Sequence, residues 1–300
     1  MNIMIILNYN DYETTLEYLD RIENYTTLDK IIVVDNCSPD ESYNKLKKRA
    51  SEKIIVIKTE SNKGYASGNN YGIKYAEQKY SPRNIIISNP DIIVSENSLR
   101  KVCIFLDSHD EYAAASGLIH DTNNKIVSNF AWKLPTYKDM MVNTHLIASK
   151  IYHKLTDSGQ FYNKETINAA SNILNVGVLS GCFFVIKHKV FKEIGYFDER
   201  TFLYNEENIL AYKLNEIGFK QGVLISERII HFQGLSINKN IKNWNDKNKI
   251  LLDSTNIYLN NYLKVSKFKL ILFTLLFNIG KYEKFILINS KQKLMRRIRR

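Results

Sequence analysis

Short apolar runs recur along the first ninety residues of the chain and alternate with segments of helical character. The runs span residues 3–7, 31–34, 54–57 and 85–87. They are rich in β-branched side chains, which is typical of parallel strands that are buried on both faces. Residues 38–50, which open with a Ser-Pro-Asp-Glu start signal, and residues 65–79, which follow a glycine, are expected to be helices. This alternation predicts an α/β domain with a central, mostly parallel sheet.

Polar side chains follow the predicted strands at the points where they end. Asn8 follows the first apolar run, Asp35 and Asn36 follow the second, and Asn89 and Asp91 follow the fourth. In sheets of this kind, ligands bind beyond the carboxyl ends of the parallel strands. We therefore expect these amides and carboxylates to gather along one edge of the sheet.

Asp35 and Asp91 each have a functional and a structural interpretation. A carboxylate at a strand end can accept hydrogen bonds from a nucleotide base or ribose, which fits Asp35. It can also hold a divalent ion together with a diphosphate, which fits Asp91. However, Asp35-Asn36 and Asn89-Pro90-Asp91 are also good turn sequences. The residues alone leave both interpretations open.

The second half of the chain adds three candidates. A strand is expected at residues 182–186, and a helix is expected from near Glu206 until Gly218 ends it. Glu206 or Glu207 can act as a general base toward an acceptor hydroxyl, although acids are favoured in any first helical turn. Neighbouring helical residues point in different directions, so at most one of the two is expected to be the base. His231 is either a structural histidine or a group that contacts a metal or a phosphate.

The composition is that of a folded globular chain. Of the 300 residues, 44% are hydrophobic and 24% are charged, which excludes disorder as the main state. The three cysteines, at positions 37, 103 and 182, argue against a disulfide framework or a thiolate zinc site and favour a reducing compartment. The first residues lack the basic region and the long apolar run of a secretory signal. We therefore expect a cytoplasmic protein.

Positive charge is concentrated at the C-terminus. Residues 264–300 contain eleven Lys or Arg and one acid, Glu283, and so carry +10 of the net charge of +11. A nucleic-acid partner is not expected, because it requires a basic surface on the folded body. The apolar run at 270–277 is too short to span a bilayer. Its basic flanks indicate an interfacial helix on an anionic membrane. The alternative is a helical hairpin that packs on the body of the protein.

Several short motifs occur in an order that resembles a known family. The motifs are Asn8-Tyr9-Asn10, Val34 to Asp40, Asn62 to Ile73, Asn89-Pro90-Asp91, Leu179 to Cys182, Gly195 to Glu199, Phe202 to Glu207, and His231 to Ser236. In this order they resemble bacterial glycosyltransferases of family 2. The rhamnosyl- and galactofuranosyltransferases are the closest-looking branch. The resemblance covers roughly residues 1–240.

The resemblance implies a GT-A fold, which binds nucleotide sugars, over residues 1–240. Residues 241–300 would then form a C-terminal helical segment that associates with a membrane. The positions that match the family's nucleotide-sugar-binding residues are Asn8, Asp35, Asn36, Asn62, Lys63, Gly64, Asn69 and Asn89.

The resemblance also implies a divalent cofactor, Mn²⁺ or Mg²⁺. Asp91 matches the last carboxylate of the family's Asp-x-Asp metal motif, whose first carboxylate is here Asn89. His231 matches a position near the diphosphate and is the second candidate metal ligand. Glu207 falls where the family places its catalytic base, and Glu206 is its neighbour.

These roles predict an inverting, metal-dependent glycosyltransferase. It would move a sugar from a nucleoside-diphosphate sugar, such as dTDP-rhamnose or a UDP-sugar, to a lipid-linked saccharide acceptor. It would serve in bacterial surface polysaccharide synthesis and lie on the inner face of the cell membrane, attached through residues 264–300. The alternative is a non-catalytic sugar-nucleotide-binding or scaffold protein, in which the paired glutamates only start a helix.

Overall fold

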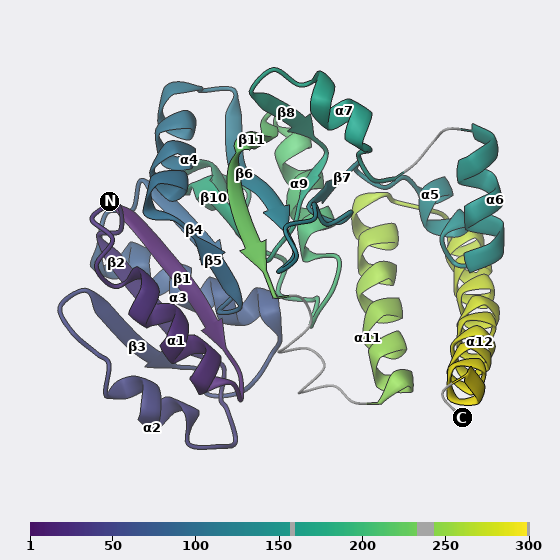
Figure 1. Ribbon diagram of the computed structural model, residues 1–300, viewed down its shortest axis with the longest axis horizontal. Helices are drawn as coiled ribbons and strands as arrows, with labels where there is room; N and C mark the ends of the chain where they lie inside the picture. The colour runs from purple at the N-terminus through teal and green to yellow at the C-terminus, as the bar shows by residue number, and fades with distance from the viewer. Residues whose placement is uncertain (157–159, 233–242, 299–300) are drawn as a thin grey trace.

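The structure is a computed structural model that describes residues 1–156, 160–232 and 243–298 (Figure 1). Its strands are β1 (Asn2–Asn8), β2 (Lys30–Asp35), β3 (Ile54–Lys58), β4 (Asn84–Ser88), β5 (Ile92–Val94), β6 (Tyr112–His120), β7 (Ala131–Trp132), β8 (Ile173–Val176), β9 (Val178–Leu179), β10 (Phe183–Lys187) and β11 (Lys220–His231). The helices that belong to the sheet domain are α1 (Tyr12–Ile22), α2 (Ser42–Lys47), α3 (Tyr65–Lys79), α4 (Glu96–Ser108), α7 (Lys164–Ala169), α8 (His188–Glu193) and α9 (Glu206–Glu216). The remaining helices are α5 (Tyr137–Val142), α6 (Leu146–Thr156), α11 (Trp244–Ile257) with its π-helical continuation η1 (Tyr258–Tyr262), and α12 (Lys267–Ile298).

Nine of the described strands form one central sheet. Their order is β3-β2-β1-β4-β10-β6-β11-β5, and β8 pairs with β11. Strands β3, β2, β1 and β4 are parallel to one another, and so are β6 and β11, whereas β10, β5 and β8 run antiparallel to their neighbours. The predicted mostly parallel sheet is therefore confirmed. The carboxyl ends of the parallel strands meet at one edge, where β5 and β10 begin.

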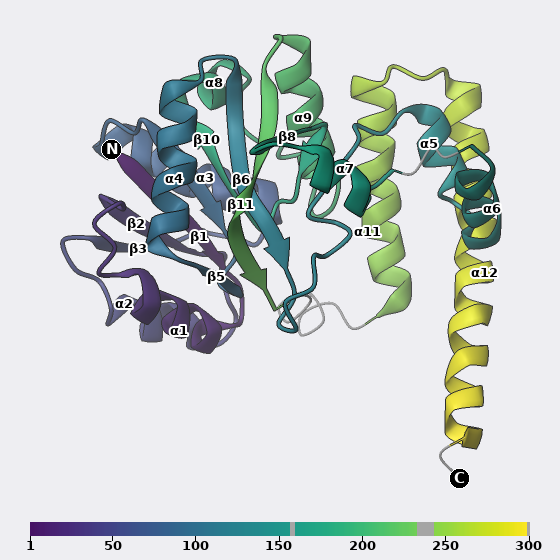
Figure 2. The same cartoon turned by 45° about the horizontal axis from the view of Figure 1, so that its top comes forward.

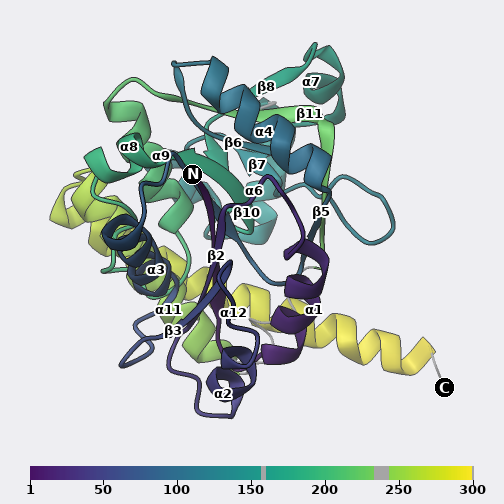
Figure 3. The same cartoon turned by 90° about the vertical axis from the view of Figure 1, so that its left-hand side faces the viewer.

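Helices cover both faces of the sheet. In Figure 3, α1 and α4 lie on one side of it and α3, α8 and α9 lie on the other. The approach of α3 is close: a Cβ at Gly72 would lie 2.7 Å from Cγ2 of Val34 and 2.9 Å from Cγ2 of Ile5. The strand side chains between these layers form the main core, because apolar side chains on both faces of a parallel sheet must be covered.

The two helices predicted in the first half of the chain agree with the structure to different extents. The helix predicted at 65–79 is confirmed as α3 (Tyr65–Lys79). The helix predicted at 38–50 is shorter, because α2 begins only at Ser42. Ser38 does not cap it: the Ser38 hydroxyl donates to Asp35 at 2.6 Å instead. The start signal is therefore used to shape the loop at the end of β2.

The C-terminal helices form a second, smaller core beside the sheet. Leu259, Phe273 and Phe277 are buried in it and pack with partly buried side chains of α5, α11 and α12. α12 runs well past the other helices (Figure 2). No helix in the described part of the chain has an apolar stretch long enough to cross a membrane. The predicted domain boundary at residue 240 lies outside the described residues.

Candidate active site

Asn8 and Asp35 meet at the carboxyl ends of β1 and β2, as predicted. The Asn8 amide donates to Oδ1 of Asp35 at 2.9 Å. The hydroxyl and the backbone N–H of Ser38 donate to the same carboxylate at 2.6 and 3.1 Å. Asp35 is fully buried. Its carboxylate therefore fixes the loop that follows β2, in which Cys37 has a left-handed backbone with φ of 57°.

Asn36, Asn62 and Gly64 form a second connected group beside it. The Asn36 amide donates to Oδ1 of Asn62 at 2.9 Å and to the carbonyl of Gly64 at 3.1 Å. The N–H of Gly64 donates back to Oδ1 of Asn62 at 2.9 Å. Lys63 is exposed, whereas Asn69 is buried within α3 and donates to the Tyr65 carbonyl. Three of the predicted donor-binding residues thus hold one turn in place, and Lys63 projects from it.

Asp91 and His231 come together where β5 begins and β11 ends. His231 is paired with Ile92 across the β11–β5 ladder, and its Nε2 lies 3.4 Å from Oδ2 of Asp91. Burial lowers the pKa of His231, but hydrogen bonds to Asp91 and Cys182 outweigh it and raise the pKa to about 10. The two predicted metal ligands are therefore neighbours that attract each other.

The remaining oxygen of Asp91 fits a cation. Oδ1 is buried and has no hydrogen-bond partner, which is costly for a carboxylate oxygen unless a positive group binds there. Asp91 and His231 provide oxygen and nitrogen ligands suited to Mn²⁺. The described residues contain no group of three or more His, Cys, Asp or Glu that could hold a metal ion. Asp91 and His231 therefore offer a divalent ion two ligands, fewer than it usually takes.

The segment Gly181-Cys182 connects this pair to Glu207. The N–H of Gly181 donates to Oε1 of Glu207 at 3.3 Å. The carbonyl of Cys182 accepts from the N–H of Asn89 at 2.8 Å, and its thiol contributes to the raised pKa of His231. The candidate base and the candidate metal ligands therefore lie on the same edge of the sheet, on either side of two consecutive residues.

Glu206 and Glu207 differ in their surroundings, as expected for neighbours on a helix. Glu206 is 2% exposed, its Oε1 has no partner, and burial together with the charge of Glu207 raises its pKa well above the usual range. Glu207 is partly exposed. Burial raises the pKa of Glu207 too, while backbone donors such as Gly181 oppose the change. Only Glu207 is placed to meet a group from solvent.

Several residues that shape this site were not assigned a role from the sequence. The Tyr65 hydroxyl donates to the Gly181 carbonyl at 2.7 Å and so supports the segment that contacts Glu207. Tyr204 and Asn205 both have left-handed backbones, with φ of 74° and 66°, directly before Glu206. Gly181 lies within a motif used for the resemblance, which is the only sequence signal for it. Tyr65, Tyr204 and Asn205 also lie within such motifs, but no local pattern marks their contacts.

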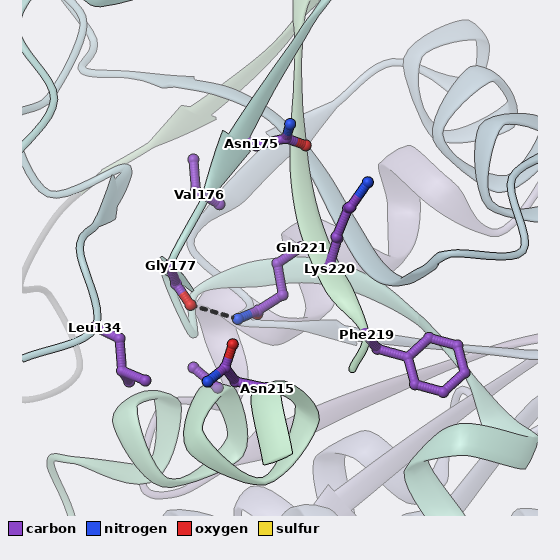
Figure 4. Close-up of a pocket in the computed structure, with 9 residues that line it drawn as sticks. Leu134, Asn175, Val176, Gly177, Asn215, Phe219, Lys220 and Gln221 are labelled. Carbon is purple, nitrogen blue, oxygen red and sulfur yellow. Dashed lines mark hydrogen bonds between the residues drawn. The ribbon is translucent and has the colours of Figure 1, made fainter. Parts of the chain in front are cut away.

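A pocket of about 220 Å³ lies away from this edge. Figure 4 shows it between the C-terminal part of α9 and the start of β11, with Asn215 and Lys220 in its lining and the Gln221 amide bonded to the Gly177 carbonyl at 2.7 Å. None of the predicted site residues lines it.

Comparison with protein families gives a match to the model described as glycosyl transferase family 2, over residues 3–195. A low-salt glycan biosynthesis hexosyltransferase, Agl10 of Haloferax volcanii, is 26% identical over 70% of this chain. The rhamnosyltransferase WbbL of Escherichia coli is 24% identical over 56% of this chain. The matched parts span 60% and 61% of these relatives' own lengths.

Two solved structures share the fold. GalNAc-T7, solved with UDP, GalNAc and Mn²⁺, superposes with a TM-score of 0.58 and 16% identity over 77% of this chain and 43% of its own. The mannosyltransferase PcManGT of Pyrobaculum calidifontis, solved with GDP-Man and Mn²⁺, gives a TM-score of 0.57 and 11% identity over 98% of this chain and 79% of its own. The predicted GT-A fold is confirmed.

Proposed function

This chain belongs to glycosyl transferase family 2, and we propose that it transfers a sugar from a nucleoside-diphosphate sugar to a saccharide hydroxyl. The observation that carries the proposal is the placement of Glu207 and the Asp91–His231 pair on either side of Gly181-Cys182. A transferase needs these two functions side by side, because the leaving group and the acceptor both act on one sugar carbon.

The nucleotide part of the donor binds at the ends of the first strands in this proposal. Asp35 and Asn36 are buried and bonded within the protein, so they would shape the strand-end loop against which the base and ribose bind, and Asn8 holds Asp35 in place. The turn at Asn62-Lys63-Gly64 closes over the nucleotide, and the exposed Lys63 is available to its phosphates. Asn69 supports the first turn of α3, and Asn89 lies next to Asp91 at the diphosphate.

Asp91 and His231 would hold the divalent ion. When bound, Mn²⁺ or Mg²⁺ supplies positive charge that stabilises the departing diphosphate. To hold a cation, His231 would have to give up its imidazole proton, because both use the same nitrogen lone pair. The unpartnered Oδ1 of Asp91 supports this assignment, as do two related folds that were crystallised with Mn²⁺.

Glu207 would act as the general base. The acceptor oxygen forms a bond to the sugar C1 as the bond from C1 to the diphosphate oxygen breaks, and the leaving group keeps that electron pair. The acceptor proton passes to a carboxylate oxygen of Glu207. Attack from the side opposite the leaving group inverts the anomeric carbon. Glu206 is too buried to reach an acceptor, and burial together with the charge of Glu207 raises its pKa.

The acceptor is proposed to be lipid-linked, because α12 has a second apolar face that is open to solvent. One face packs inside the small helical core through Phe273 and Phe277. The other carries side chains that are more than half exposed: Phe268, Ile271, Leu275, Ile279, Tyr282 and Ile286. Together with the +10 charge of residues 264–300, this face fits an anionic membrane surface. The packing alternative applies to the first face, and we propose membrane binding for the second.

The expected location is the inner face of a bacterial cell membrane, where the enzyme would serve surface polysaccharide synthesis. The names of two relatives support this class of product, since one is a glycan biosynthesis hexosyltransferase and one a rhamnosyltransferase. The side chains of residues 288–300, which carry much of the positive charge, lie outside the described part of the structure.

The proposal is tested by binding and by turnover. Thermal unfolding is measured with UDP-glucose, UDP-galactose, UDP-GlcNAc, dTDP-rhamnose and GDP-mannose, each with and without MnCl₂. The nucleotide sugar that stabilises the protein most is then assayed for release of its nucleoside diphosphate. Metal-dependent stabilisation with turnover supports a transferase. Stabilisation with no turnover on any acceptor favours the non-catalytic binding protein. If no nucleotide sugar stabilises the protein and none is turned over, both proposals are refuted.

A further inference from the structure

The loop that leads into α9 has an unusual backbone. Tyr204 and Asn205 are consecutive and both left-handed, with φ of 74° and 66°. Asparagine tolerates this conformation, but tyrosine rarely adopts it, and such residues persist only where surrounding contacts hold them. The direction in which Glu207 leaves this loop therefore depends on whatever holds Tyr204 and Asn205.

A buried chain of hydrogen bonds runs through this loop to α11. The Trp132 indole N–H donates to Asn208 at 2.8 Å, and the Asn208 amide donates to Asn205 at 2.8 Å. The Asn205 amide donates to Oγ1 of Thr255 at 3.0 Å, and the Thr255 hydroxyl donates to the Leu251 carbonyl at 2.7 Å. Asn205, Asn208 and Thr255 are all buried, so each bond is shielded from water.

The side chain of Asn205 does not cap α9, although Asn205 occupies the N-cap position. It is the N-cap residue of α9, yet its side chain makes no capping hydrogen bond with that helix. Asparagine at an N-cap normally accepts from the backbone of the first turn. Here the Asn205 oxygen accepts from the Asn208 side-chain amide instead, and its NH2 group donates to Thr255 on a different helix. The side chain thus ties the start of α9 to α11.

The same loop is held at two further points. The Ser254 hydroxyl donates to the Leu203 carbonyl at 2.8 Å, from the turn of α11 next to Thr255. On the opposite side, the N–H of Tyr65 donates to the Phe202 carbonyl at 2.8 Å. A Cβ at Gly64 would lie 2.0 Å from that same carbonyl oxygen. The loop is therefore clamped between the proposed donor-binding turn and α11.

We propose that Ser254 and Thr255 of α11 are positioning residues for the catalytic base: they hold the left-handed loop that aims Glu207 at the acceptor. The inference rests on the proposed transfer reaction. It makes α11 part of the active-site framework, although sequence analysis assigned the region after residue 240 to membrane association or to packing on the body of the protein. Neither hydroxyl touches substrate in this role.

The role of Thr255 is tested with a matched set of variants. Thr255→Val keeps the shape of the side chain but can neither accept from Asn205 nor donate, whereas Thr255→Ser keeps the hydroxyl. Thr144→Val is the control, because Thr144 is as buried and likewise donates to a carbonyl in the preceding turn, that of Met141, away from the loop. The reaction followed is donor hydrolysis, with the nucleotide sugar that gives the largest thermal shift and water as the acceptor.

We expect Thr255→Val to lower kcat by about 10- to 100-fold, since small displacements of a catalytic group have effects of this size. KM for the donor should stay within about twofold, because the donor site is not altered. Thr255→Ser should restore most of kcat, and Thr144→Val should resemble the unmodified protein. An unchanged kcat in Thr255→Val, or an equal loss in Thr144→Val, would overturn the inference.

A second measurement keeps this test separate from the proposed activity. Amide hydrogen exchange of residues 202–208 should become faster in Thr255→Val and stay unchanged in Thr144→Val, with or without turnover. If the unmodified protein shows no turnover at all, the transfer reaction fails, while the exchange data still decide whether α11 holds the loop. Equal exchange in both variants would reject the positioning role.

Discussion

The backbone N–H of Gly181 lies 3.3 Å from Oε1 of Glu207, and there is no room between them for a side chain. The next residue, Cys182, accepts a hydrogen bond from Asn89 and neighbours His231. Two consecutive residues thus contact both halves of the candidate site. The backbone of this segment contacts Glu207 and Asn89, and the Cys182 thiol contacts His231.

Replacing Glu207 by Gln tests the base directly. Glutamine keeps the shape and can still accept from Gly181, but it cannot take a proton. We expect kcat to fall by about 10²- to 10⁴-fold, while the thermal shift produced by the nucleotide sugar is retained. Glu206→Gln, at a buried position that an acceptor cannot reach, should lose far less. A larger loss in Glu206→Gln than in Glu207→Gln would reverse the assignment.

Gly181→Ala tests the contact between Gly181 and Glu207. The new Cβ would lie 2.5 Å from Oε1 of Glu207, so the carboxylate has to move. We expect kcat to fall while the donor KM changes little, as measured by steady-state kinetics. Gly222→Ala is the control: its Cβ would meet the Tyr112 ring at 3.1 Å, far along β11 from the site. Equal kcat values in the two variants would show that the contact has no catalytic importance.

The pH dependence of kcat should reveal the raised pKa of the base. Glu207 acts only when it is deprotonated, and burial raises its pKa above the ordinary value of 4.5. Activity is therefore present above the raised pKa and is lost as pH falls through it. Because Glu206 and Glu207 titrate together, the fall of kcat at acidic pH reports the pKa of the pair rather than that of Glu207 alone. Circular dichroism at each pH controls for unfolding. A loss of kcat centred at or below pH 4.5 would contradict a base whose pKa is raised by burial.

Asp198 should stabilise the junction between the sheet domain and η1. Burial raises the pKa of Asp198, but hydrogen bonds from Arg200 and Tyr262 outweigh it and lower the pKa to about 2. The stabilisation is present above the ordinary value of 3.8 and is lost as pH falls through about 2. Because Arg200 is half exposed, we expect Asp198→Asn to cost about 1–2 kcal/mol at pH 7.

Urea unfolding at pH 7 and at about pH 2 measures this contribution. The difference between the unmodified protein and Asp198→Asn should be largest at pH 7 and should nearly vanish at the lower pH. Asp20→Asn removes an exposed partner of Arg49 and should cost at most about 0.5 kcal/mol. A pH-independent cost for Asp198→Asn would indicate lost packing rather than lost charge.

Membrane binding should depend on the open face of α12. The double variant Leu275→Asp with Ile279→Asp places two charges on that face without touching the buried Phe273 and Phe277. Co-sedimentation with vesicles of phosphatidylglycerol and phosphatidylcholine should fall about tenfold or more. Ile104→Asp, at an equally exposed position on α4, should bind as the unmodified protein does. Equal binding by the double variant would exclude this face as the contact.

The elements of the first half were predictable because their signals are local. The apolar runs at 3–7, 31–34 and 85–87 fall within β1, β2 and β4, and the polar residues after them meet at one edge as expected. Parallel strands with short crossovers leave few other arrangements. Even here Ser38 was misread, because the loop it shapes depends on Asp35, a contact the helix pattern does not contain.

The relations that complete the site were not predictable, because they join distant parts of the chain. β10 inserts antiparallel between β4 and β6, and this is what brings Gly181 to Glu207. The bond from Asn205 to Thr255 spans fifty residues between two helices. A single sequence has no periodicity that reports such pairs. The sequence likewise did not indicate that one face of α12 packs beside α5 and α11 through Phe273 and Phe277.

Two separate parts of the chain contribute to the small helical core, first α5 and then α11 and α12. A Cβ at Gly280 of α12 would lie 2.0 Å from the Thr144 carbonyl. The C-terminal helices α11 and α12 are therefore not an independent unit that could be removed or fused to another transferase. A protein without α11 and α12 would expose the apolar side chains of Met140 and Met141 to solvent. It would be prone to aggregate, and this would obscure any effect of the truncation on catalysis.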